Sequence, residues 1–166
     1  CNACMKRIVA APTAGSCGVL PAVLLPCGRR FGLPREQMIR ALYVSAGFGM
    51  VIANRASISG AEGGCQAEVG SAAAMAAAAL VFLMGGTDEM MANACAMAVK
   101  NLLGLVCDPV GGLVEVPCVK RNVIGAMDAL SAAQMALAGI TSRVPPDQVL
   151  DAMREVGDAL PHSLKE

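Results

Sequence analysis

The sequence predicts an all-α protein, a compact multi-helix domain whose glycine- and proline-rich loops carry the reactive side chains. Apolar residues recur at helical spacing, and alanine, the strongest helix former, dominates the middle of the chain. The one strand-like pattern of alternating residues is the short run 113–116. A chain of 166 residues can bury a core without disulfides, and no domain boundary or internal repeat interrupts it. We therefore expect a single helical domain over residues 1–166.

Glycine, proline and capping residues set the expected helix boundaries. Residues 1–10 have the character of a helix tail, and 11–18 and 57–64 are expected loops. Pro26 is expected to kink the helix that contains it, and Thr87, followed by two acidic residues, is an expected N-cap. The loop 104–117 contains several glycines and prolines. The predicted helices after the first ten residues are 19–30, 34–53, 65–84, 88–103, 119–140 and 146–160.

The alanine-rich segment 65–84 is expected to be the central helix. Its small side chains let neighbouring backbones come close. The stretch 71–84 carries no charge, which raises the possibility of a membrane span. Spanning a bilayer takes about 20 apolar residues, and this run ends earlier, at Gly85-Gly86. We therefore expect a buried helix of a soluble protein and no membrane partner.

Charge and cysteine content argue against two kinds of protein, a nucleic-acid-binding protein and a secreted protein held by disulfides. The chain has 13 basic and 13 acidic residues and no cationic block, which argues against nucleic-acid binding. Its eight cysteines follow no secretory signal, and the chain is rich in alanine and methionine rather than short and loop-dominated. These features favour free thiols in a reducing cytoplasm over a disulfide framework.

Three cysteines, Cys65, Cys107 and Cys118, lie beside glycine or proline where a loop is expected to meet a helix. Backbone N–H groups and the positive end of a helix dipole favour a thiolate at such a position. Asp108-Pro109 leaves the backbone after the second cysteine free to turn. The spacing matches no compact ferredoxin motif, so spacing alone leaves a shared metal site open. Three thiolates on a four-iron cluster would leave one iron open as a Lewis acid.

The other cysteines are expected to have ordinary roles or are left open. Cys95 lies among alanine and methionine in a predicted helix and is expected to be a core side chain. Cys1 and Cys4 form a Cys-x-x-Cys pair, but no second pair stands at the spacing of a zinc ribbon. The roles of Cys17 and Cys27 are undecided.

Three segments carry a resemblance to a known family. They are APTAGSCGVLP at 11–21, GCQAEVG at 64–70 and NLLGLVCDPVGGLVEVPCVKRN at 101–122. Together they resemble the alpha chain of iron-sulfur-dependent L-serine dehydratase, and the resemblance covers essentially the whole chain. Gly111 departs from the family pattern, which often has alanine there. The resemblance implies that the chain is the C-terminal part of a longer alpha subunit or domain.

The resemblance implies a reaction, a cofactor and the ligands of that cofactor. Cys65, Cys107 and Cys118 fall on the three cluster ligands of the family, so we expect them to converge on a 4Fe-4S cluster. The implied reaction converts L-serine to pyruvate and ammonia by elimination of water, without pyridoxal phosphate. The open iron would stabilise charge on the departing hydroxyl oxygen.

The expected substrate contacts lie in the loop 11–18, where helix-start N–H groups and two hydroxyls suit the carboxylate of serine. An ordinary small-residue loop with a capping serine is the simpler interpretation. The charged turn after Cys118 could offset cluster or carboxylate charge, or could be a solvated helix face. Glu68, one turn after Cys65, could lie next to the cluster or could be a first-turn partner of the helix dipole, which is the simpler interpretation. The candidate substrate residues are Thr13, Gly15 and Ser16, and the candidates next to the cluster are Lys120, Arg121 and Asn122.

The general base is not identifiable in this sequence. The sole histidine, His162, lies in a polar terminal stretch and belongs to no motif of the family. The resemblance implies that a beta subunit or domain completes the active site, within a homo- or hetero-oligomer. Two alternatives stay open: a noncatalytic helical module that binds a metal or a partner, and a related lyase acting on another small amino acid such as threonine or cysteine.

Overall fold

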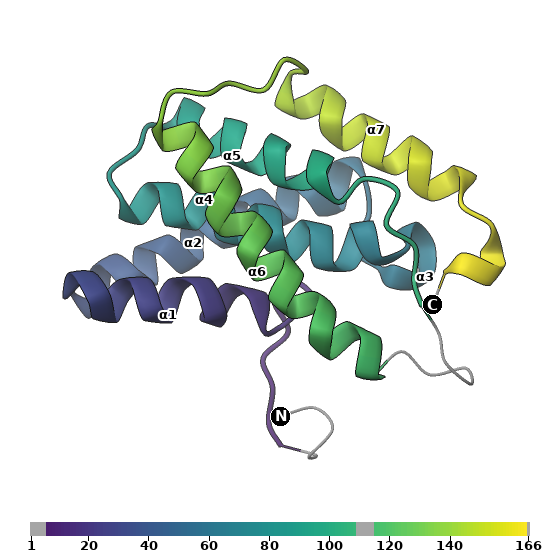
Figure 1. The fold of residues 1–166 in the computed structure, drawn as a ribbon, viewed down its shortest axis with the longest axis horizontal. Helices are drawn as coiled ribbons and strands as arrows, with labels where there is room; N and C mark the ends of the chain where they lie inside the picture. Colours follow the sequence, from purple (N-terminus) through teal and green to yellow (C-terminus); the bar gives the residue numbers. More distant parts are fainter. Residues whose placement is uncertain (1–5, 109–114, 166) are drawn as a thin grey trace.

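The computed structural model describes residues 6–108 and 115–165, without the side chains of 115–117, and all regular structure in these residues is helical (Figure 1). The all-α fold class is therefore confirmed. The elements are α1 (Val19–Phe31), α2 (Arg35–Arg55), α3 (Gly60–Gly63), the π-helix η2 (Gln66–Gly70), α4 (Ser71–Leu83), α5 (Asp88–Asn101), α6 (Glu115–Leu137), α7 (Pro146–Ala159) and the 3-10 helix η3 (His162–Leu164).

Helix α4 is the centre of the fold, as its alanine content predicts. It packs against α1, α2, α5 and α6, and only Phe82 of its thirteen residues is not fully buried. Figure 1 shows α6 crossing in front of α4, with α2 behind. The stretch Gln66–Leu83 is long and apolar enough to cross a membrane, but 94% of it is buried inside the protein. Packing within the fold therefore accounts for its apolar character.

Local signals place most helix ends correctly. The Thr87 hydroxyl accepts a hydrogen bond of 3.2 Å from the Met90 N–H, which confirms the predicted N-cap of α5. Pro146 is the first residue of α7, where a missing N–H costs no helical hydrogen bond. Pro26 lies inside α1, which continues to Phe31.

Four expectations about the elements are wrong. Residues 6–10 have no helical structure, and the expected loop 57–64 contains the short helix α3, which ends at Gly64 with φ of +73°. The segment after Cys65 begins as a π-helix rather than an α-helix. Helix α6 begins at Glu115, so the second half of the strand-like run is helical, and Pro117 is accommodated because it lies in the first turn.

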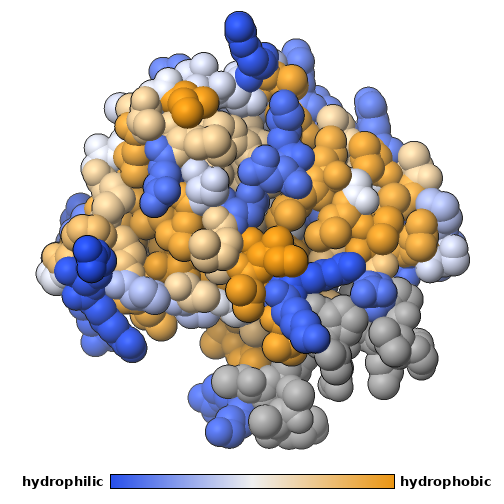
Figure 2. Space-filling model, in the orientation of Figure 1, coloured by the Kyte–Doolittle hydropathy of each residue, from blue (hydrophilic) through white to orange (hydrophobic). Residues whose placement is uncertain are grey.

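Helix α6 turns its small side chains inward. Its buried positions after the first two turns are glycine and alanine, and they face α1, α4 and α5. Several of its large apolar side chains point outward, and they include Val123 and Met127, 64% and 60% exposed. Figure 2 shows this apolar surface over α6, broken by charged groups. We call it the α6 apolar face, and its residues are Val119, Val123, Ile124 and Met127.

Candidate functional site

The segments that carry Cys65 and Cys107 lie side by side. Cys65 is the residue that precedes η2, and the N–H of the next residue, Gln66, donates a 2.9 Å hydrogen bond to the Leu105 carbonyl. The Cys107 thiol lies 3.7 Å from the carbonyl oxygen of Gly60, at the start of α3. Two cysteines separated by 41 residues in the sequence thus belong to one junction.

Arg121 joins the third cysteine segment to this junction. It lies three residues after Cys118 on α6, and its guanidinium donates to the Val106 carbonyl and lies 3.9 Å from the Asp108 carboxylate. The same guanidinium lies near enough to the Cys65 thiol to lower the pKa of that thiol. Its side chain is only 16% exposed, so the interpretation of this residue as a solvated helix face is wrong.

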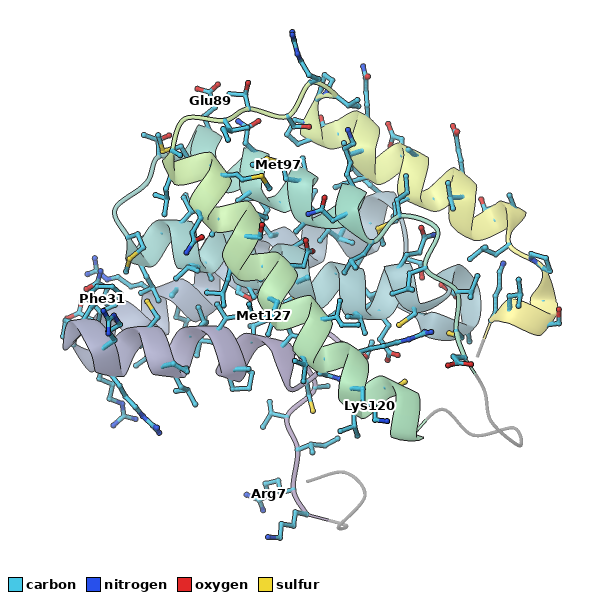
Figure 3. The ribbon with its side chains drawn as sticks, viewed as in Figure 1. Arg7, Phe31, Glu89, Met97, Lys120 and Met127 are labelled. Atoms are coloured by element: carbon cyan, nitrogen blue, oxygen red, sulfur yellow. The ribbon has the colours of Figure 1, made fainter. Side chains whose placement is uncertain are left out.

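Lys120, next to Arg121, behaves differently. Its side chain is exposed, and Figure 3 shows it on α6, on the same helix as Met127. A solvated lysine retains most of its hydration and contributes a screened charge rather than a fixed contact. The structure therefore separates the two basic neighbours: Arg121 belongs to the junction, and Lys120 lies on the surface.

Two opposed effects act on the pKa of the Cys65 thiol. Burial raises its pKa, while the hydrogen bond and positive charge of Arg121 lower it. Burial is the larger effect, so the helix start alone does not favour a thiolate here as strongly as expected. Cys107 is buried and Cys118 is half-buried. Among the described side chains, no three His, Cys, Asp or Glu residues form a group that could hold a metal ion, so the assignment of the three ligands stays a prediction.

Asn122 fastens the loop 11–18 to α6. Its Nδ2 donates hydrogen bonds of 2.7 Å to the carbonyls of Gly15 and Cys118, and its Oδ1 accepts one of 3.0 Å from the Gly18 N–H. A side chain at Gly18 would place its Cβ 3.0 Å from this oxygen. One amide thus connects the predicted substrate loop to the turn that carries Cys118.

Glu68 lies against the same loop, which the sequence interpretation missed. Its side chain is buried, 6% exposed, and accepts a hydrogen bond from the Thr13 hydroxyl. The Thr13 hydroxyl also lies 2.9 Å from that of Ser16, which is fully buried. Glu68 therefore does more than complement a helix dipole, because it also holds the loop through Thr13. A single acidic residue in an otherwise apolar stretch, three positions after a candidate ligand, was the signal available in the sequence.

Gln66 is a second residue that the sequence interpretation missed. Its side chain is 1% exposed; its Nε2 donates to the Met153 carbonyl at 2.9 Å, and its Oε1 accepts from the Gly104 N–H at 2.8 Å. These bonds tie the segment after Cys65 to α7 and to the turn before Cys107. Both hydrogen-bonding ends of a buried amide are satisfied, as burial requires.

His162 lies elsewhere. It lines a hollow of about 470 Å³ between α7, α3 and the end of α2, together with Arg154, Asp158 and Lys165. None of the candidate ligand or substrate residues lines this hollow. The structure thus gives His162 no place among the predicted site residues.

The remaining cysteines in the described part of the chain differ in how deeply they are buried. Cys95 is 3% exposed in α5, and burial raises its pKa to about 12, which confirms that it is a core side chain. Cys27 is buried in α1, and Cys17 is half-buried beside Ser16. Cys1, Cys4 and Gly111 lie outside the described residues.

Comparison with known proteins identifies the family. A family model described as the serine dehydratase alpha chain matches residues 1–166. The chain is 61% identical over 165 residues to a probable L-serine dehydratase, alpha chain, of Bacillus subtilis. This alignment covers 99% of the present chain and 55% of the Bacillus subtilis protein. The corresponding protein of Latilactobacillus sakei is 58% identical, with 99% and 79% covered. The L-serine dehydratase alpha chain of Peptoniphilus asaccharolyticus is 50% identical, with 99% and 56% covered. This chain, which spans about half the length of two of these relatives, therefore belongs to the serine dehydratase alpha chain family.

Proposed function

We propose that this chain is the part of an L-serine dehydratase that carries the cofactor ligands, in an enzyme that converts L-serine to pyruvate and ammonia. The observation that carries the proposal is the junction at Arg121, where the segments bearing Cys65, Cys107 and Cys118 meet. Family membership and the names of the relatives support the choice of reaction.

The proposed cofactor is a 4Fe-4S cluster held by Cys65, Cys107 and Cys118. The positive charge of Arg121 lowers the pKa of the Cys65 thiol, and a thiolate is the form that binds iron. The segments of Cys107 and Cys118 adjoin the same arginine, which supports the choice of these three cysteines as the ligands. When bound, the cluster supplies an open iron that acts as a Lewis acid toward the departing hydroxyl group.

The residues of the chain itself position these groups. Arg121 holds the loop of Cys107 through the Val106 carbonyl, and its positive charge lowers the pKa of the Cys65 thiol. Asn122 fixes the loop that presents Thr13, Gly15 and Ser16, which we propose contact the substrate. Burial of the junction excludes water and strengthens the electrostatic interactions inside it.

The proposed partner is the beta subunit or domain of the same enzyme, and we propose that it supplies the proton-abstracting base. The α6 apolar face begins directly after Cys118 and is exposed over at least two turns of α6. Exposed apolar patches of this kind mark interaction sites. A partner bound there would lie next to the proposed active site.

Iron content and pyruvate formation test the proposal. The complete alpha chain, prepared anaerobically with its beta partner, should be brown, contain close to four irons, and form pyruvate from L-serine. Replacing Cys65, Cys107 or Cys118 with serine should abolish both iron binding and pyruvate formation. Cys95→Ser should retain both, because this side chain is a core residue.

Two outcomes would contradict the proposal. A folded, colourless protein after anaerobic reconstitution would favour a noncatalytic helical module. Loss of iron in Cys95→Ser while the protein stays folded would contradict the ligand assignment. A third outcome would change only part of the proposal: faster turnover of L-threonine or L-cysteine than of L-serine would mean that another amino acid is the preferred substrate of the same kind of elimination.

A further inference from the structure

We propose that Glu68 binds the α-ammonium group of the substrate, so that the loop 11–18 holds the amino end of the amino acid rather than its carboxylate. This inference rests on the proposed function and specifies how its site selects an amino acid. It also revises the expectation that Thr13, Gly15 and Ser16 hold the carboxylate.

The first observation is the place of the Glu68 carboxylate. It lies on η2, buried to 6% exposure, where the Thr13 hydroxyl donates to it. Buried carboxylates are costly unless charge-assisted hydrogen bonds satisfy them. A carboxylate has about four lone-pair positions, so it can accept bonds from a hydroxyl and from an ammonium group together. π-Helices of this kind occur frequently at functional sites.

The second observation is how closely the loop approaches the carboxylate. A Cβ built at Gly15 would lie 2.8 Å from one Glu68 oxygen and 3.0 Å from the other. Any other residue at this position would therefore have to displace the carboxylate. The loop meets Glu68 with bare backbone at Gly15 and with the Thr13 hydroxyl, which is half-exposed. Two of the three candidate substrate residues are thus in direct contact with the carboxylate.

The third observation is the sign of the charge beside the loop. The Glu68 carboxylate accepts a hydrogen bond from Thr13 and lies against Gly15, two of the three candidate substrate residues. An α-amino acid carries its ammonium and carboxylate groups on one carbon, the α-carbon. A substrate carboxylate placed beside Glu68 would be repelled, whereas an ammonium group would be attracted. The charge of Glu68 therefore favours a substrate whose ammonium group faces this loop.

A matched pair of ligands tests this orientation. L-Alanine and L-lactate differ only in an ammonium or a hydroxyl group on the α-carbon, and neither has the β-hydroxyl that the proposed elimination requires. Their dissociation constants can be measured by ligand-observed NMR on the anaerobic complete enzyme. We expect the wild-type enzyme to bind L-alanine at least tenfold more tightly than L-lactate.

The variant Glu68→Gln keeps the shape and the acceptor for Thr13 but removes the charge. It should weaken L-alanine binding by about 10- to 150-fold, the range of a charge-assisted hydrogen bond, and leave L-lactate binding unchanged or stronger. Glu62→Gln is the control, because this exposed acid on α3 bonds to Ser57 instead. It should change neither constant.

Equal weakening of both ligands in Glu68→Gln would overturn the proposal, because it would assign Glu68 a purely structural role in holding the loop. No change for either ligand would overturn it as well. If Glu68→Gln does not fold, Gly15→Ala in its place should weaken L-alanine selectively, by displacing the carboxylate; equal weakening of both ligands would refute the assignment. Failure of the proposed function would appear separately, as an absence of pyruvate from L-serine in the wild-type enzyme.

Discussion

Asp128 shows how burial changes the chemistry of a single residue. Its Oδ1 accepts a 2.6 Å hydrogen bond from Asn101, while its buried Oδ2 has no hydrogen-bond partner among the described residues. Burial raises the pKa of this carboxyl to about 6, and the bond from Asn101 acts in the opposite direction. The folded protein thus favours the protonated form of Asp128 more than the unfolded chain does. In the unfolded chain an aspartate has a pKa of about 3.9.

The sign of the pH dependence follows from linkage. Since the pKa is higher in the folded state, the stabilisation from this group is fully present below about pH 4 and is lost as the pH rises through about 6. We expect the stability of Asp128→Asn relative to wild type to be greatest near pH 7 and to decline toward pH 4.5. Urea unfolding at four pH values measures this difference.

A pH-independent difference for Asp128→Asn would show that its carboxyl titrates normally.

Cys95 should be the least reactive described thiol. It is 3% exposed and its pKa is raised to about 12 by burial, so very little thiolate is present at pH 8. In cluster-free native protein, iodoacetamide should modify the half-buried Cys17 well before Cys95, as measured by mass spectrometry of peptides. Equal rates in the native state, with both rates lower than in urea, would contradict this order.

At the scale of elements, two helical glycines test how closely the helices pack. A Cβ at Gly125 on α6 would lie 2.8 Å from Val69 of η2 and 3.2 Å from Val19 of α1, whereas a Cβ at Gly47 on α2 meets nothing within 4 Å. We expect Gly125→Ala to destabilise the protein by about 1–3 kcal/mol through overpacking. Gly47→Ala should stabilise it by about 0.5–1 kcal/mol, because alanine is the better helix former.

Urea unfolding of the two variants decides this prediction. The glycine-to-alanine substitution should lower the free energy of unfolding in α6 and raise it in α2, so helix propensity alone cannot explain the result. Stabilisation by Gly125→Ala would show that α6 lies further from η2 than the structure has it. It would also weaken the placement of Arg121 and Asn122, which project from the same helix.

The π-helix η2 connects the loop 11–18 with α7 and with the turn before Cys107. It follows Cys65, carries Glu68 and contains the buried Gln66 that bonds to α7 and the turn at Gly104. Alanine content predicts a helix here but does not predict its type. The π-helix begins at Gln66, whose tertiary hydrogen bonds the local sequence does not reveal.

At the scale of the whole molecule, we predict that this chain alone forms almost no pyruvate, even with iron bound. Among the described residues it presents ligands and a substrate loop, while His162 lies in a separate hollow. Orienting a substrate against both a Lewis acid and a base can lower a barrier by about 7–11 kcal/mol. A pyruvate assay on the anaerobic, iron-loaded chain tests this prediction.

Adding the rest of the alpha chain and the beta partner should restore activity, because the chain spans only 55% of its Bacillus subtilis relative. Turnover by the chain alone at the rate of the complete enzyme would contradict the prediction. It would place the base within these 166 residues, and the surroundings of Cys17 and His162 would be the first to examine.

Local sequence patterns specify most of the helices of this protein, because helix propensity and capping act within a few residues. Alanine content predicted the central helix α4, Thr87 predicted the start of α5, and Pro146 predicted the start of α7. The same local patterns identified Cys95 as a core residue. The motifs around the three candidate ligands supplied the family, which comparison confirmed.

The assembly of the site depends on tertiary contacts, because these contacts join residues that lie far apart in the chain. Glu68 meets Thr13 across 55 positions, and Asn122 meets Gly15 across 107. Arg121 and Lys120 are adjacent basic residues in the sequence, and packing alone buries one and exposes the other. Local patterns cannot encode such differences, since burial and charge pairing depend on which helices the fold brings together.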